Sequence, residues 1–97
     1  MKLYFESYNN ELSINDIYDV IYSNLKEMMH VLPRIETSKD HLEFRLDNYF
    51  AKNVLSSTIK RWLKEARIDT SLVKIIRDKH LTSWSGKTDG YDYTIII

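Results

Sequence analysis

Three histidines are the residues of this sequence best suited to acid–base chemistry near neutral pH. An H-x-T motif begins at His80, a spacing that phosphoester-cleaving enzymes use twice, once for the acid and once for the base. Neither His30 nor His41 has a threonine two positions later, so the motif is not repeated. A histidine pair for RNA cleavage, with Lys79 or Lys87 stabilising the phosphate, is therefore a minor hypothesis. We expect surface or capping histidines and no enzymatic activity.

A second motif, Gly86-Lys87-Thr88, has the residues that close a phosphate-binding loop. Such a loop also needs a glycine five residues earlier, where this sequence has Leu81, and a helix after the threonine, where a strand is predicted. We therefore expect a hairpin tip rather than a nucleotide site. The chain has no cysteine, and its histidines lack metal-ligand spacing, so neither a metal nor another cofactor is predicted.

The charges sum to zero but are unevenly distributed along the chain. Residues 1–50 carry nine acidic and five basic side chains, whereas residues 51–97 carry nine basic and five acidic ones. Part of the basic excess falls on the outer side of a helix predicted over Tyr49–Arg67, whose cations are Lys52, Lys60, Arg61, Lys64 and Arg67. Cations at helical intervals can follow a line of phosphates, so nucleic-acid binding is one interpretation.

The same basic helix has an alternative interpretation. The first predicted helix is acidic through residues such as Asp19 and Glu27, and it would neutralise the second helix if the two pack side by side. An RNA-binding sheet would also carry stacking aromatics on its open face, whereas His41, Glu43 and Arg45 are predicted there. Nucleic-acid binding is therefore the second hypothesis.

Seven tyrosines and two tryptophans are many for 97 residues, and both side chains are favoured at protein interfaces. Tyr18 and Trp62 have core positions, but the remainder cannot all be buried. The last strand, Tyr91–Ile97, is expected at the edge of the sheet, where a partner or a second copy could cover its open backbone groups by strand addition. The predicted protein-binding residues are Trp84, Lys87, Tyr91, Tyr93 and Ile96.

Two helices and the strands around them must position these residues. A short apolar strand over Lys2–Glu6 precedes a helix over Ile14–Met29, in which apolar residues recur at intervals of three and four. Ser13 is a good N-cap, and Asp16 completes a variant of the capping box. Pro33 prevents the helix from continuing.

The rest of the chain alternates between strand and helix. Val31–Thr37 and His41–Asp47 predict a hairpin, and the helix over Tyr49–Arg67 follows it. Leu72–Arg77 and Tyr91–Ile97 predict two further strands, joined by a long hairpin with its tip in residues 85–90.

The order β-α-β-β-α-β-β over residues 1–97 indicates one α+β domain. The predicted architecture is a βαββαβ ferredoxin-like sandwich with an extra C-terminal edge strand and two helices on one face of an antiparallel sheet. There is no charged-then-apolar leader and no apolar run of membrane-spanning length, so a cytoplasmic protein without a membrane partner is expected.

Because no catalytic group of residues is found, the leading hypothesis is a binding protein. The composition is typical of a small stoichiometric inhibitor that occludes a partner protein, as immunity proteins, antitoxins and phage-encoded inhibitors do. An RNA- or DNA-binding module that uses the second helix is the alternative, and a histidine-dependent ribonuclease comes third.

Overall fold

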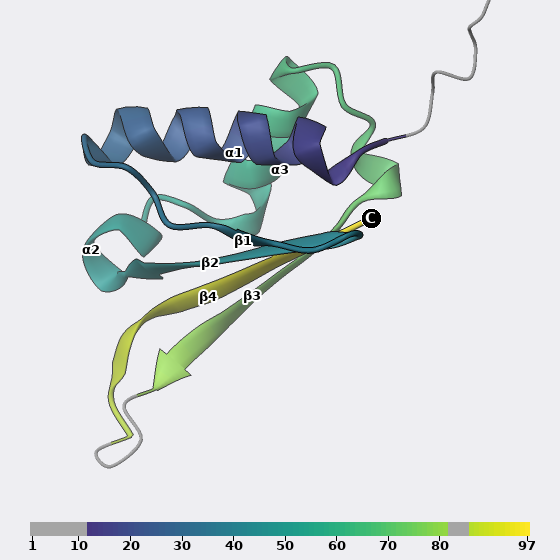
Figure 1. Ribbon diagram of the computed structural model, residues 1–97. Helices are drawn as coiled ribbons and strands as arrows, with labels where there is room; N and C mark the ends of the chain where they lie inside the picture. Colours follow the sequence, from purple (N-terminus) through teal and green to yellow (C-terminus); the bar gives the residue numbers. More distant parts are fainter. Residues whose placement is uncertain (1–11, 82–85) are drawn as a thin grey trace, which may run out of the picture.

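The computed structural model describes residues 12–81 and 86–97 (Figure 1). The strand predicted over Lys2–Glu6 and the predicted contact residue Trp84 lie outside these ranges. The helices and strands along the described chain are α1 (Ile14–Met29), β1 (Glu36–Thr37), β2 (His41–Asp47), α2 (Asn48–Ala51), α3 (Ser56–Glu65), the 3₁₀ helix η2 (Thr70–Leu72), β3 (Lys74–Leu81) and β4 (Thr88–Ile96).

The described strands form one antiparallel sheet in the order β1-β2-β4-β3. The C-terminal strand β4 lies inside this sheet, with Tyr93 opposite Phe44 on one side and opposite Arg77 on the other. The prediction that this strand is an edge, open to strand addition or dimerisation, is wrong. An inner position allows neighbours on both sides to pair the backbone groups of this strand, whose apolar residues face the core.

The order of the strands also differs from the ferredoxin-like order that the sequence predicted. In that arrangement the strand over Lys2–Glu6 would separate the strands here called β2 and β3. The described structure has β4 in this position, because β4 pairs with β3 as a hairpin and with β2 on its other side. The α+β class and the antiparallel sheet are confirmed, and β1 and β3 are the edges of the described sheet.

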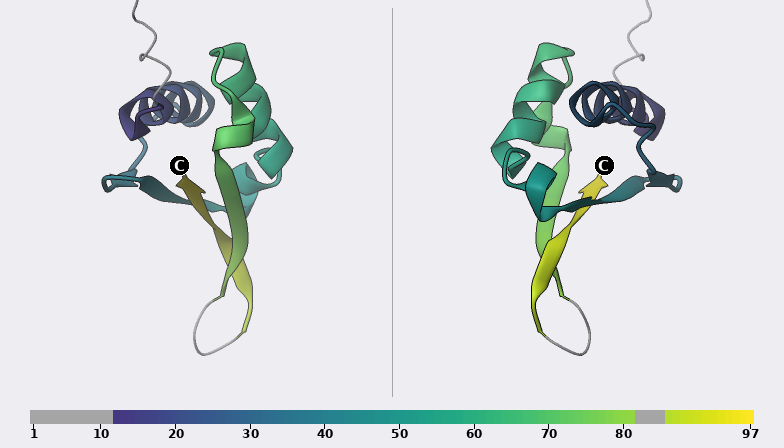
Figure 2. Two further views of the ribbon diagram at one scale, coloured as in Figure 1. Left: turned by 90° about the vertical axis from the view of Figure 1, so that its right-hand side faces the viewer. Right: turned by 90° about the vertical axis from the view of Figure 1, so that its left-hand side faces the viewer.

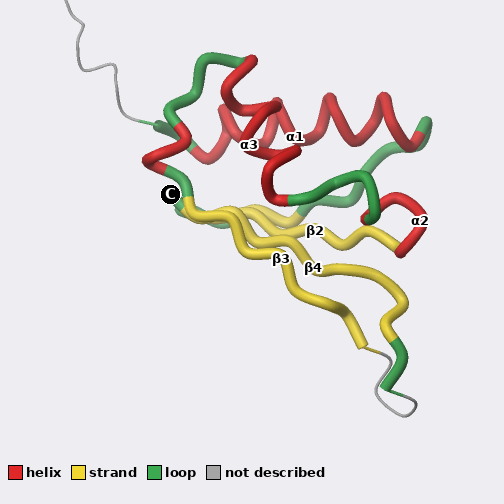
Figure 3. Tube along the Cα trace, turned by 180° about the vertical axis from the view of Figure 1, so that it is seen from behind, coloured by secondary structure: helices red, strands yellow, loops and turns green. Residues whose placement is uncertain are grey.

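The helices α1 and α3 lie over the same face of the sheet, which confirms the predicted two-layer arrangement (Figure 1, Figure 2). Buried side chains on this face come from β2 and β4 and include Leu42, Phe44, Leu46, Tyr93 and Ile95. No described element covers the opposite face, which we call the open face (Figure 3). The alternation of apolar and polar residues along β2 therefore decides which side is buried.

The helix α1 begins and ends at the predicted residues. The Ser13 hydroxyl accepts a hydrogen bond from the Asn15 N–H at 3.1 Å, and the Asp16 carboxylate accepts one from the Ser13 N–H at 3.4 Å. Its apolar stripe is fully buried at Ile17, Ile21 and Leu25. Local caps and a 3.6-residue period are enough to specify this helix.

The single helix predicted over Tyr49–Arg67 is wrong, because the chain divides it into α2 and α3. The break buries Val54, whereas Leu55 is 46% exposed. At the start of α3 the Thr58 hydroxyl accepts a hydrogen bond from the Leu55 N–H at 3.1 Å. At the break, the carbonyl of Ala51 accepts a hydrogen bond from the Val54 N–H at 3.1 Å, and the carbonyls of Ala51 and Val54 also accept from a donor on another element.

Arg77 of the edge strand β3 is that donor. Its Nη2 donates to the carbonyl of Ala51 at 2.8 Å, and its Nε donates to the carbonyl of Val54 at 3.0 Å. The guanidinium lies 3.8 Å from the centroid of the Tyr91 ring. The buried Tyr93 hydroxyl donates to the same Val54 carbonyl at 2.7 Å. One arginine therefore joins the edge strand to the break between two helices.

The C-terminal end of α3 is a Schellman motif in which an arginine holds the left-handed position. The Ile68 N–H donates to the carbonyl of Leu63, and the Arg67 N–H donates to that of Lys64, both at 2.9 Å. Arg67 has a φ of 65°, a conformation that glycine adopts without a steric penalty. The helix end is therefore strained at Arg67.

Replacing Arg67 with glycine is expected to raise the free energy of unfolding by about 0.5–1 kcal/mol, because the side chain no longer opposes the left-handed backbone. Urea denaturation measures the change. The matched control is Arg61→Gly in the middle of α3, which is expected to lower the free energy of unfolding by about 1 kcal/mol. A destabilised R67G protein would mean that contacts of the Arg67 side chain outweigh the strain.

Candidate functional site

The three histidines lie too far apart to act as an acid–base pair. His41 is opposite Ile96 and His80 is opposite Gly90, near the two ends of β4. The intervening length of strand is roughly 20 Å at about 3.3 Å per residue. His30 follows α1 in the helical layer. The two-histidine site considered from the sequence is therefore not assembled.

His80 belongs instead to a charged network on the open face. Its Nδ1 lies 3.0 Å from one oxygen of Asp92, and the other oxygen accepts a hydrogen bond from Arg45 Nε at 2.7 Å. The Nε2 of His80 lies 3.9 Å from the Asp89 carboxylate, and Asp78 sits directly opposite Asp92 in the strand register. A carboxylate can orient a histidine for proton transfer, but the surrounding acids disfavour a phosphate substrate.

Burial raises the pKa of Asp92, but hydrogen bonds from Arg45 and His80 outweigh it and hold the pKa below the usual 3.8. Because the folded pKa is lowered, this carboxylate stabilises the fold above its unfolded pKa, and the contribution is lost as pH falls through the folded value. Side-chain NMR titration should show that Arg45→Gln raises the pKa of Asp92, while Lys39→Gln, in the β1–β2 turn, leaves it unchanged. An unchanged pKa in Arg45→Gln would contradict this account.

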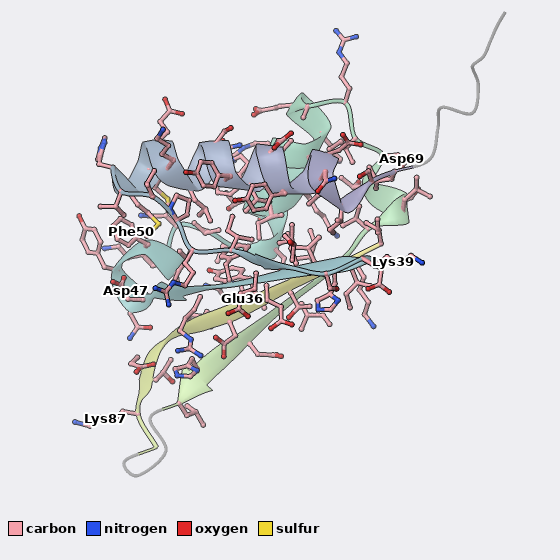
Figure 4. The ribbon with its side chains drawn as sticks, in the orientation of Figure 1. Glu36, Lys39, Asp47, Phe50, Asp69 and Lys87 are labelled. Carbon is pink, nitrogen blue, oxygen red and sulfur yellow. The ribbon has the colours of Figure 1, made fainter. Side chains whose placement is uncertain are left out.

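The predicted protein-binding residues do not form one surface. Tyr93 is fully buried and belongs to the core. Tyr91 is half-buried against Arg77 on the helical side of β4, while Ile96 is half-buried on the open face. Lys87 lies at the far end of the β3–β4 hairpin, where its side chain points away from the sheet (Figure 4). Because these residues point to opposite sides, they cannot contact one flat partner together.

The motif Gly86-Lys87-Thr88 leads into a strand, as the sequence predicted. β4 begins at Thr88, so no helix N-terminus follows the motif to bind a phosphate. Gly86 has a φ of 72°, which suits a turn. The motif therefore belongs to the β3–β4 connection.

The exposed side of α3 and the residues just after it form a basic surface. Its cations are Lys60, Arg61, Lys64 and Arg67, which we call the basic face. The opposite side of the helix is buried through Ile59, Trp62 and Leu63. Within the described ranges, none of the four cations makes an ion pair with a carboxylate. Glu65 of the same helix is also exposed, so the surface carries four cations and one carboxylate.

The fifth predicted cation, Lys52, lies just after α2 and contacts an aromatic ring. Its ammonium is 5.1 Å from the centroid of Tyr49, whose side chain is 68% exposed. The Tyr49 ring also meets Phe50 edge to face, with centroids 5.0 Å apart. Tyr49 was not among the residues predicted to bind a partner, and the break between α2 and α3, which gives it this position, has no clear local signal in the sequence.

A shallow groove lies at the end of α1 and was not predicted either. Its lining residues are Tyr22, Ser23, Lys26, Glu27, His30, Val31 and Leu32. Val31 is 57% exposed and Leu32 is 71% exposed, so both leave apolar surface in solvent. In the sequence, this apolar surface corresponds to two adjacent apolar residues before Pro33. The sequence predicts them to be part of a strand over Val31–Thr37, and this part of the prediction is wrong. The strand β1 begins only at Glu36.

Within residues 12–81 and 86–97, no three acidic or histidine side chains are placed to share a metal ion. None of the described helices is long and apolar enough to cross a membrane. Comparison of the chain with protein-family models, curated proteins and solved structures finds no match.

Proposed function

We propose that this protein binds nucleic acid through the basic face of α3 and acts by binding rather than by catalysis. The observation that carries the proposal is the group of four exposed cations without a carboxylate partner in the described structure. Lys60 and Lys64 lie one helical turn apart, about 6 Å along the axis. Cations at this spacing, anchored on a helix that is buried on its other side, can contact successive phosphates.

A net charge of zero does not exclude this function, because several of the acidic side chains lie on a different face of the fold from α3. Acidic side chains on the open face and its rim include Glu43, Asp78, Asp89 and Asp92, while the basic face lies in the helical layer. Charges farther apart than a Debye length, about 10 Å at 0.1 M salt, are largely screened from each other. A phosphate at α3 therefore responds mainly to the charges of the helical layer, which are the basic face, Glu65 and the acidic residues of α1.

The test is a fluorescence-anisotropy titration of labelled, mixed-sequence RNA and DNA with the purified protein at several salt concentrations. Binding is expected to weaken steeply with salt, with a log–log slope of roughly −3 to −4 for four phosphate contacts on duplex DNA. A gel of the recovered RNA should show intact strands. Absence of binding even at low salt would contradict the proposal, and cleaved RNA would contradict its non-catalytic part.

A second candidate function is the stoichiometric neutralisation of a partner protein by surface occlusion. The groove at the end of α1 supports it, because Val31 and Leu32 present adjacent apolar side chains to solvent. For a reconstituted 1:1 complex, Leu32→Asp should abolish association on size-exclusion chromatography, whereas reversal of the charges on α3 should not. The opposite pattern would assign the contact to the basic face.

A further inference from the structure

We propose that Tyr49 and the ammonium of Lys52 form a base-stacking platform at α2, the helix that precedes the basic face in the chain, so that the preferred ligand is single-stranded nucleic acid. This inference rests on the proposed function and names the class of nucleic acid that would fit it. The platform combines the two groups that single-strand binding requires, an exposed aromatic face and nearby cations.

The Tyr49 ring is exposed but supported. Its side chain is 68% exposed, although it is attached to the first turn of a helix that follows directly from β2. The neighbouring Phe50 ring meets it edge to face at 5.0 Å and 83°. Phe50 is itself half-buried against the core, so it limits how the Tyr49 ring can turn. A supported ring costs less conformational entropy on binding than a mobile one.

Lys52 gives the platform a positive charge at the ring. Its ammonium lies 5.1 Å from the Tyr49 centroid, within the range of a cation–π contact. Within the described residues, no carboxylate pairs with Lys52. A base that stacks on this face of Tyr49 would take the place of the ammonium, and the flexible Lys52 side chain would then be close to the phosphate of that nucleotide.

The platform is continuous with the basic face along the chain. Only residues 52–55 separate α2 from α3, and Figure 4 shows Phe50 on α2 at the end of the sheet where the chain turns back toward α3. In a duplex, the base faces are covered by their neighbours, so a surface tyrosine distinguishes single strands from duplexes.

The test compares the affinities of Tyr49 variants for (dT)12, (rU)12 and a 12-base-pair duplex by fluorescence anisotropy. Tyr49→Ala is expected to weaken binding of both single strands by about ten-fold or more and to leave duplex binding within about two-fold. Tyr49→Phe, which keeps the aromatic face, is expected to retain the affinity of the natural chain. Leu81→Ala serves as a control for removal of an exposed apolar side chain outside the platform, and thermal unfolding confirms that each variant is folded.

Two results would overturn the inference while leaving the proposed function intact. One is a Tyr49→Ala protein with unchanged affinity for both single strands. The other is an equal loss of affinity for single strands and duplex. If the natural chain binds none of the three ligands at low salt, the proposed function itself fails, and the groove at the end of α1 becomes the site to study.

Discussion

Replacing Arg77 with alanine is expected to lower the free energy of unfolding by about 3 kcal/mol. The substitution removes charge-assisted hydrogen bonds to the carbonyls of Ala51 and Val54 and the stacking of the guanidinium on Tyr91. A hydrogen bond from a charged donor contributes about 1.5–3 kcal/mol. The loss would release the edge strand β3 from the break between α2 and α3.

Two neighbouring substitutions test whether the forked geometry of Arg77 matters. Arg77→Lys keeps the charge but cannot reach both carbonyls as a planar fork, so an intermediate loss is expected. Tyr93→Phe is expected to cost about 1 kcal/mol, because Val54 would still accept a hydrogen bond from Arg77. Urea denaturation of the three variants gives the values. If Arg77→Ala costs less than Tyr93→Phe, the carbonyls are satisfied in another way and the account is wrong.

The elements that the sequence predicts best are those with local determinants. The helix α1 has its N-cap at Ser13 and a regular apolar stripe, and neither depends on the rest of the fold. The turn between β1 and β2 lies at the predicted residues, with the Ser38 N–H donating to the carbonyl of His41 at 2.8 Å. Period-two alternation in β2 also predicted which residues are buried.

The features that the sequence could not predict depend on distant residues. Gly90 marks the position where β4 approaches β2, since an added Cβ would lie 2.4 Å from the carbonyl oxygen of Leu46. In the sequence this glycine predicts only a turn. Likewise, nothing local in the sequence indicates that Arg77 donates to carbonyls 23 and 26 residues away, at the break between α2 and α3.

The candidate site also combines features that the sequence predicts locally with features that depend on tertiary structure. The cations of α3 share one side of a helix, so helical periodicity alone indicates the basic face. Whether α1 would neutralise them depended on tertiary geometry, and the described structure contains no such ion pair. Arg67 adds a cation at a strained left-handed position where glycine would be more stable.

The charge-reversed variant Lys60→Glu with Lys64→Glu is expected to weaken nucleic-acid binding by about 100-fold at low salt, because two attractions to phosphate become two repulsions. The slope of log affinity against log salt should become shallower by about two. Both side chains are exposed and make no ion pair in the described structure, so unfolding should change by only about 0.5 kcal/mol.

The matched control is Lys74→Glu with Lys79→Glu on the edge strand β3, which changes the total charge by the same amount at a different surface. If binding depends on the basic face, this control should lose only a small part of the affinity, since its charges are screened from α3. An equal loss in both variants would mean that total charge, and not the arrangement of cations on α3, determines the affinity. The protein would then be a weak general polyelectrolyte binder, and the platform at Tyr49 would have no basic face to extend.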